Sequence, residues 1–187
     1  WIAWTTCSGH GTSVNWFVAL CHHRVLVTGS IDKTLRKWNI RSRERIWKID
    51  AHSKTVAALA RHPGESLFAA GSYDGKAKIW DAESGAPLAE YKDFGRNLTA
   101  LMFLSGGKRL LGAGLGEEMV VWDTESGSVL QRFPAHAEAT ARLFLPARSP
   151  YLLSAGADRT LKQWNTDTWD VVNRVELPAG GVAPIAL

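Results

Sequence analysis

The sequence predicts an all-β fold of repeated four-stranded antiparallel sheets, and two observations support this prediction. The first is a short alternating run ending in Trp-Asn or Trp-Asp, which recurs at Trp38, Trp80, Trp122 and Trp164, each 42 residues after the one before. A fixed period of about 40–45 residues indicates a repeat architecture with one supersecondary unit per period. The second observation is that four short β-rich segments fit into each period, whereas no segment has a sustained helical periodicity.

Turn-forming residues separate the expected strands within each period. Examples are Ser105-Gly106-Gly107 between the first two strands and Glu83-Ser84-Gly85 between the last two, where glycine permits a positive φ. The expected strands are 14–20, 25–29, 35–39 and 46–49; 56–60, 67–71, 77–81 and 88–91; 98–104, 109–113, 119–123 and 129–133; and 140–145, 151–155, 161–165 and 171–175. We therefore expect a β-propeller built from four-stranded antiparallel blades.

The whole chain, 1–187, reads as one propeller segment without a linker. Its expected parts are the outer strand of a preceding blade (1–7), four blades (8–49, 50–91, 92–133 and 134–175) and the start of a following blade (176–187). A propeller must close on itself to hide its sheet edges. About four blades with a partial blade at each end therefore suggest part of a larger propeller, or a chain completed by a partner.

Composition excludes several classes of protein. The 187 residues are 45% hydrophobic and 21% charged, which is typical of a globular chain, and no apolar run approaches the roughly 18 residues of a membrane span. The start shows no signal or transit peptide, and two cysteines fit a reducing compartment. We expect an intracellular, cytoplasmic protein, with the nucleus as the alternative, and no membrane partner.

Further residues recur in step with the tryptophans. His10, His52 and His136 precede the first strand of their periods, and an aspartate lies six residues before three of the tryptophans. With Thr28-Gly29-Ser30 and Gly71-Ser72 on the second strands, the chain resembles the WD-repeat β-propeller family over nearly its whole length. The resemblance is specific for the fold but silent on function, because this fold hosts many roles.

The resemblance implies a hydrogen-bonded tetrad inside each blade, made of His, Ser or Thr, Asp and Trp. A buried indole N–H and a buried carboxylate both need partners. The first and fourth blades carry complete sets, His10, Thr28, Asp32 and Trp38, and His136, Ser154, Asp158 and Trp164. The second blade has His52, Asp74 and Trp80 but Ala70 in the hydroxyl position.

The third blade keeps only the tryptophan of the set. Phe94, Gly112 and Gly116 occupy its three polar positions. We expect this blade to be held by apolar packing, with the Trp122 N–H bonded elsewhere or reaching water.

These sets also suggest a catalytic triad, but a structural network explains them better. A nucleophile must be exposed beside an oxyanion site, whereas these residues repeat in step with the tryptophan. Zinc ligation is equally disfavoured, because about 20 Å of strand separates Cys7 and His10 from Cys21, His22 and His23. We expect no enzyme activity, catalytic residue, cofactor, metal or small-molecule substrate.

Positive charge concentrates in the first blade. Residues 11–52 hold eight Lys or Arg against three Asp or Glu, although the net charge of the chain is only +4. The cations are Arg36, Lys37, Arg41, Arg43, Arg45 and Lys48. They form either a solvated edge that blocks strand pairing or a surface for RNA or an acidic protein.

The loops that enter each blade and join its second and third strands are expected on one face, which often meets partners in this family. Ile31, Tyr73 and Leu115 are bulky apolar residues in these loops. With Lys54 and Arg96 they form a candidate patch of apolar anchors and a charged rim. The alternative is ordinary loop packing.

The sequence favours a non-catalytic protein-interaction scaffold that docks other proteins through the loop face or the rim within a multiprotein assembly. One alternative is an RNA- or ribonucleoprotein-associated component that uses the basic first blade. Another is a regulatory or sensor propeller fused to a domain outside this segment.

Overall fold

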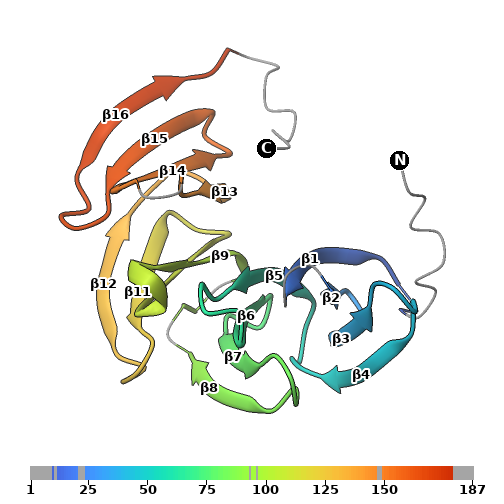
Figure 1. Cartoon of the computed structure of the whole chain (residues 1–187). Helices are drawn as coiled ribbons and strands as arrows, with labels where there is room; N and C mark the ends of the chain where they lie inside the picture. Colours follow the sequence, from blue (N-terminus) through green and yellow to red (C-terminus); the bar gives the residue numbers. More distant parts are fainter. Residues whose placement is uncertain are drawn as a thin grey trace.

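The computed structural model describes residues 10, 12–20, 24–92, 94–95, 97–146 and 149–178, which form four antiparallel sheets arranged in an arc (Figure 1). Blade 1 consists of β1 (Val14–Leu20), β2 (Val25–Ser30), β3 (Thr34–Asn39) and β4 (Arg45–Asp50). Blade 2 consists of β5 (Val56–Arg61), β6 (Leu67–Ser72), β7 (Ala77–Asp81) and β8 (Pro87–Tyr91). Blade 3 consists of β9 (Leu98–Leu104), the short 3-10 turn η1 (Ser105–Gly107), β10 (Arg109–Gly114), β11 (Glu118–Asp123) and β12 (Val129–Pro134). Blade 4 consists of β13 (Thr140–Phe144), β14 (Tyr151–Gly156), β15 (Thr160–Asn165) and β16 (Val171–Glu176).

These strands confirm the predicted fold class. Every predicted strand is present, and no boundary differs by more than one residue. The partial blades expected at 1–7 and beyond residue 178 lie outside the described residues, so the division of the chain ends remains a prediction. No helix in the described ranges is long and apolar enough to cross a membrane.

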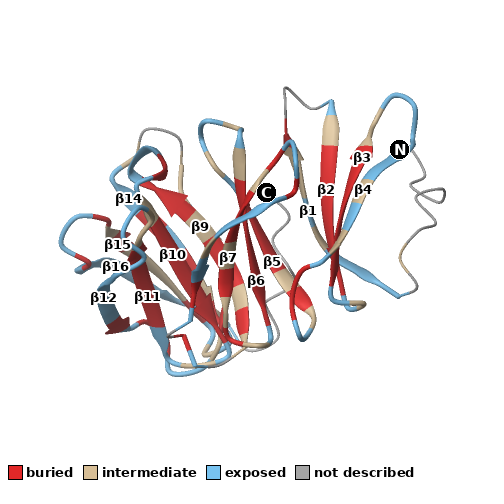
Figure 2. Cartoon of the chain, turned by 90° about the horizontal axis from the view of Figure 1, so that it is seen from below, coloured by how far each residue is buried: buried red, intermediate tan, exposed pale blue. Residues whose placement is uncertain are grey.

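Each sheet runs from the inside of the arc to the outside in chain order. The innermost strands β1, β5, β9 and β13 contact one another in succession, and β4, β8, β12 and β16 form the outer edge (Figure 1). Apolar side chains fill the spaces between neighbouring blades, as Phe68 and Trp80 do between blades 1 and 2. Buried residues therefore concentrate in the middle strands, while the outer strands are largely exposed (Figure 2).

Every outer strand has a bulge opposite the tryptophan of its blade. In blade 1, for example, Trp38 pairs with Arg45 and Lys37 with Trp47, which leaves Ile46 unpaired. The equivalent residues are aliphatic and exposed in all four blades; this rim set is Ile46, Leu88, Leu130 and Val172. Because bulges twist an edge and interrupt its hydrogen-bonding pattern, they hinder pairing with another chain.

A buried lysine links blade 1 to blade 2. Lys37 in β3 is 2% exposed, and its Nζ lies 2.7 Å from Oε2 of Glu83 in the β7–β8 turn. The Lys37 Nζ and the Trp47 indole both donate to the Glu83 carbonyl oxygen, at 3.4 Å and 3.3 Å. The turn of one blade thus accepts hydrogen bonds from two side chains of its neighbour, of which Lys37 is buried.

The first and last blades also meet across the middle of the arc. The guanidinium carbon of Arg142 in β13 lies 5.2 Å from the ring centroid of Trp16 in β1. This distance is within the range of a cation–π contact. Equivalent positions hold the small residues Ala58 and Ala100, so Trp16 and Arg142 narrow the centre of the arc.

Replacement of Glu83 by alanine tests the link between blades 1 and 2. Because the Glu83 carboxylate is itself exposed, we expect a loss of about 1–2 kcal/mol in the free energy of unfolding, less than for a fully buried pair. Urea denaturation measures this loss. The matched control is Glu125→Ala one period later, where Ile79 takes the place of Lys37 and a change within about 0.5 kcal/mol is expected. Equal losses in the two variants would contradict the assignment.

Candidate functional site

The four implied tetrad residues of blade 1 lie within hydrogen-bonding distance of one another. His10 Nδ1 is 2.9 Å from Asp32 Oδ2, and His10 Nε2 is 2.8 Å from Thr28 Oγ1. The Trp38 indole N–H donates to the same Thr28 oxygen at 2.9 Å. A carboxylate at the loop is thus connected through imidazole and hydroxyl to an indole in the middle of the sheet.

Blade 4 repeats this chain of contacts. His136 Nδ1 lies 3.0 Å from Asp158 Oδ1, and His136 Nε2 lies 2.7 Å from Ser154 Oγ. The Trp164 indole N–H donates to Ser154 Oγ at 2.8 Å. The arrangement therefore accommodates serine and threonine equally.

A further hydroxyl residue, a threonine in both cases, joins each complete network, and sequence reasoning missed it. The hydroxyls of Thr34 and Thr160 donate to Oδ1 of Asp32 and Asp158, at 2.7 Å and 2.8 Å. The available signal was the spacing, since both threonines lie two residues after the aspartate and three periods apart. In blades 2 and 3 the equivalent residues are Lys76 and Glu118.

Burial sets the protonation of these networks. Burial lowers the pKa of His10, His52 and His136 even though the adjacent carboxylates raise it. Burial alone would raise the pKa of Asp158, but hydrogen bonds from the Ala137 N–H and the Thr160 hydroxyl and N–H hold it at about 2. Neutral histidine beside ionised aspartate is therefore the favoured state at neutral pH.

Blade 2 shows the effect of removing the hydroxyl. His52 Nδ1 still lies 3.1 Å from Asp74 Oδ2. With Ala70 in the hydroxyl position, however, His52 Nε2 and the Trp80 indole nitrogen are both buried without a hydrogen-bond partner. The backbone of Ala70 lies close enough to the imidazole to raise its pKa, but it does not meet the geometry of a hydrogen bond with Nε2.

Blade 3 departs from the expectation for its tryptophan. The Trp122 indole nitrogen is buried and unpartnered, so it neither bonds elsewhere nor reaches water. The six-membered ring of Trp122 faces Gly112, where an added Cβ would lie 2.5 Å from it. Phe94 and Tyr91 pack against the same indole, with ring centroids 6.4 Å and 5.8 Å away. Apolar contacts hold this blade and offset the unsatisfied N–H.

The described residues offer a network rather than reactive groups, since each histidine ring in it is buried and tied to its aspartate. Within the described ranges, no group of three or more His, Cys, Asp or Glu side chains is placed to hold a metal ion. Cys7, Cys21, His22 and His23 lie outside those ranges, so the argument against zinc remains a prediction.

The apolar loop residues lie where the repeat predicts. Ile31, Tyr73 and Leu115 are 45%, 37% and 46% exposed. Their N–H groups donate to the carbonyls of Ser13, Thr55 and Asn97, at 3.3, 3.0 and 2.9 Å. These three side chains, called the loop set below, are therefore held in equivalent places on consecutive blades. Lys54 is exposed beside them, and Arg96 lies outside the described residues.

The predicted basic surface is smaller than the sequence suggests. Arg36 is not a surface residue, because it is 5% exposed, with its Nη2 donating to Asp32 Oδ2 at 3.1 Å. The reason is its place on β3, which β2 and β4 flank on both sides. Arg41, Arg43 and Arg45 do lie exposed, on the β3–β4 turn and the start of β4.

Comparison with known proteins agrees with the repeat. The family model described as WD domain, G-beta repeat, matches residues 3–39, 43–81 and 127–165, together more than half of the chain. The matches omit 82–126, which include Phe94, Gly112 and Gly116 of the blade without polar tetrad residues.

Two similar proteins cover unequal parts of the chain. The probable cytosolic iron-sulfur protein assembly protein 1 of Kluyveromyces lactis is 38% identical over 61 residues, which is 32% of this chain and 18% of that protein. The solved structure of U3-55K superposes on 90% of the chain with a TM-score of 0.83 and 21% identity. The chain spans 53% of the length of U3-55K, and this likeness shows the fold alone.

The variant Ala70→Ser tests the incomplete network of blade 2. A serine hydroxyl would reach His52 Nε2 and the Trp80 N–H, so we expect about 1 kcal/mol of added stability. The melting midpoint measures this gain. The matched control is Ala69→Ser, which places a hydroxyl in the apolar cluster between blades 2 and 3 and should destabilise by about 1–3 kcal/mol. A loss in both variants would show that the hydroxyl position is misassigned.

The stability of the fold should fall on acidification. The folded-state pKa values of the three network histidines lie below their ordinary value of 6.5, so the unfolded chain binds more protons below that pH. The stabilisation that these histidines contribute to the folded state is fully present above pH 6.5. It is lost as the pH falls below 6.5 and through their depressed folded-state pKa values. Asp158 adds a second loss between its ordinary 3.8 and about 2. Melting midpoints measured from pH 8 to pH 3 record this loss of stability. In His136→Gln the decline of the midpoint below pH 6.5 should be smaller. A midpoint that rises as the pH is lowered from 7 to 5.5 would contradict the expectation.

Proposed function

The chain belongs to the WD40 family of G-beta repeats, and we propose that it is a non-catalytic scaffold that docks protein partners of a multiprotein assembly through its loop face. Propellers of this family generally serve as protein-interaction scaffolds. We place the chain in the cytoplasm, with the nucleus as the alternative, because a partly similar relative is named as a cytosolic assembly protein.

The observation that carries the proposal is the loop set. Three bulky apolar side chains, Ile31, Tyr73 and Leu115, are exposed at equivalent positions of consecutive blades and held there by equivalent backbone hydrogen bonds. Loops fixed by a rigid sheet present side chains without a large entropic cost on binding. Apolar anchors surrounded by polar residues such as Lys54 are the arrangement from which interfaces draw most of their affinity.

The polar residues that suggest catalysis support the same proposal. His10 and His136 are engaged within their blades and direct no group toward the loop face. The RNA-associated alternative loses support, because Arg36 and Lys37 are buried in ion pairs and only part of the basic stretch remains exposed.

Affinity purification with matched surface variants tests the proposal. The loop variant carries Ile31→Ser, Tyr73→Ser and Leu115→Ser, and the rim variant carries Ile46→Ser, Leu88→Ser and Leu130→Ser. The two sets are similarly apolar and exposed, so both variants should fold with similar melting midpoints. Quantitative mass spectrometry should show proteins that are retained by the rim variant and reduced at least tenfold by the loop variant.

Three outcomes would count against loop-face docking. If the same proteins co-purified in equal amounts with both variants, the loop set would not be the surface that binds partners. Loss from the rim variant alone would move docking to the outer strands. Retention of RNA that is lost on charge reversal of Arg41, Arg43 and Arg45, with steep salt dependence, would favour the basic blade instead.

A further inference from the structure

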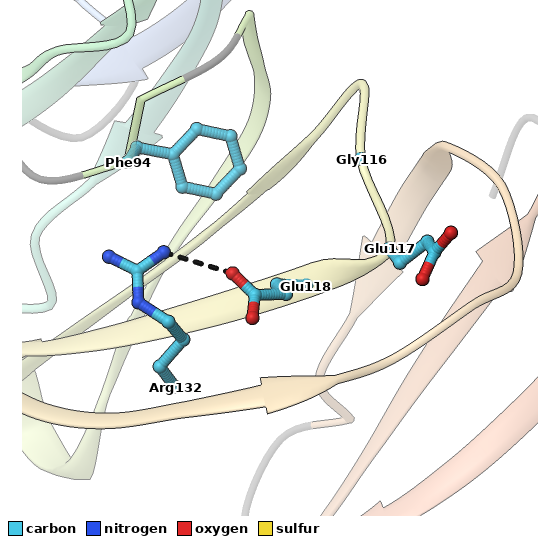
Figure 3. Close-up of a pocket in the computed structure, with 5 residues that line it drawn as sticks. All are labelled: Phe94, Gly116, Glu117, Glu118 and Arg132. Atoms are coloured by element: carbon cyan, nitrogen blue, oxygen red, sulfur yellow. Dashed lines mark hydrogen bonds and ion pairs between the residues drawn. The ribbon is translucent and has the colours of Figure 1, made fainter.

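Blade 3 contains a hollow where the other blades carry their histidine–aspartate pair. The hollow has a volume of about 350 Å³ and is lined by Phe94, Gly116, Glu117, Glu118 and Arg132 (Figure 3). This volume falls at the lower end of the range of ligand sites, which run from roughly 300 to 1,000 Å³. Because residues 116–118 directly follow Leu115, the hollow lies beside the loop set.

The other blades show which group ordinarily fills this place. In blade 2 the carboxylate of Asp74 accepts the N–H of Ser53 at 3.0 Å and the N–H of Lys76 at 3.1 Å. Asp158 accepts the two equivalent N–H groups in blade 4. A carboxylate therefore joins the loop that enters the blade to the turn between its second and third strands.

Blade 3 keeps the two donor positions but lacks the acceptor. Gly95 and Glu118 are the equivalents of Ser53 and Lys76, and Gly116 stands where the aspartate would be. A Cβ added to Gly95 would meet no atom within 4 Å, so the space beside this residue is open. Glu118 lines the unfilled space, and Gly95 directly follows the lining residue Phe94. Gly95 has a φ of 76°, which its equivalent Ser53 does not share, so the loop that enters blade 3 also differs from that of blade 2.

The turn that borders the hollow is anchored as in the other blades but differs in its middle. The Leu115 N–H still donates to the segment before β9 at 2.9 Å. The Gly116 N–H, however, donates to the Gly114 carbonyl at 3.0 Å, and Glu117 lacks the positive φ that the equivalent Gly75 has at 79°. Without a carboxylate to accept its N–H groups, the turn has taken another conformation.

The charges of the hollow do not exclude an anion. Arg132 Nη1 donates to Glu118 Oε2 at 3.0 Å, so these two side chains neutralise each other. The exposed side chain of Glu117 points away from this pair (Figure 3). An incoming carboxylate would therefore meet a compensated ion pair and the main chain of Glu118, with Glu117 as the remaining negative charge of the lining.

We propose that this hollow binds a carboxylate, namely an aspartate or glutamate side chain of a partner segment that crosses the loop face at Leu115. The carboxylate takes the place of the missing aspartate, accepts the N–H groups of Gly95 and Glu118, and returns the turn to the conformation of the other blades. This inference rests on the proposed loop-face docking and adds a charge requirement for the partner. The apolar residues of the loop set anchor the partner on three blades, whereas the carboxylate of the partner binds in blade 3 alone.

Amide NMR of the ¹⁵N-labelled chain tests the proposal with acetate as the probe, at constant ionic strength in chloride. We expect saturable shifts of the Gly95 and Glu118 amides. In Gly116→Asp the chain supplies its own carboxylate, so these shifts should be lost while the melting midpoint rises. In Glu117→Gly the left-handed turn becomes accessible, so acetate should bind severalfold more tightly. The control Leu115→Ser should titrate like the parent chain.

The control separates this inference from the proposed function, because acetate binding does not need the loop set. Absence of shifts, or equal shifts in Gly116→Asp, would overturn the carboxylate site. Shifts with propylammonium and none with acetate would assign the hollow to a basic side chain instead. N-acetyl-aspartate amide should act like acetate, and a response to N-acetylglycine alone would move the source to the C-terminus of a partner.

Discussion

The buried indole N–H in the third strand of each blade is the constraint on which this structure depends. A tryptophan at this position fills the space between neighbouring blades, but it carries a donor that water cannot reach. Blades 1 and 4 satisfy that donor through a hydroxyl, an imidazole and a carboxylate that extends to the loop surface. The network thereby connects the packing of the core to the position of the loops.

The other two blades show the consequences of losing residues from this network. Blade 2 keeps the aspartate, and its turn keeps the common conformation, although two buried nitrogens have lost their partner. Blade 3 has lost the aspartate as well, and there the turn has changed and a hollow has opened beside it. The carboxylate of the aspartate therefore sets the conformation of the turn on the loop face. The hydroxyl provides the hydrogen-bond partner of the buried nitrogens in the interior. Blades that differ in their network residues therefore also differ in the structure of their loop face.

This separation explains why residues of catalytic type need not imply catalysis here. Burial depresses the pKa of His136, whereas hydrogen bonds and the adjacent imidazole depress the pKa of Asp158 despite its burial. The same contacts hold both side chains within the blade. The groups free to contact a partner are those that the networks do not use. They include the loop set, which repeats from blade to blade, and the hollow of blade 3, which does not repeat.

The sequence by itself determined the fold, because a 42-residue period fixes which residues occupy equivalent positions in every blade. The resemblance to the WD-repeat family also implied the sets of His, Thr or Ser, Asp and Trp in blades 1 and 4. Only the tertiary structure decided the surroundings of polar groups outside these complete sets. Trp122 was expected to find a partner or water, but the apolar packing of Phe94 and Tyr91 closes over it instead. Arg36 resembles a surface cation in the sequence, yet its strand is central and its charge pairs with Asp32. The Trp122 outcome depends on aromatic neighbours distant in the sequence, and the Arg36 outcome depends on the strands beside β3. The spacing of the repeat records neither.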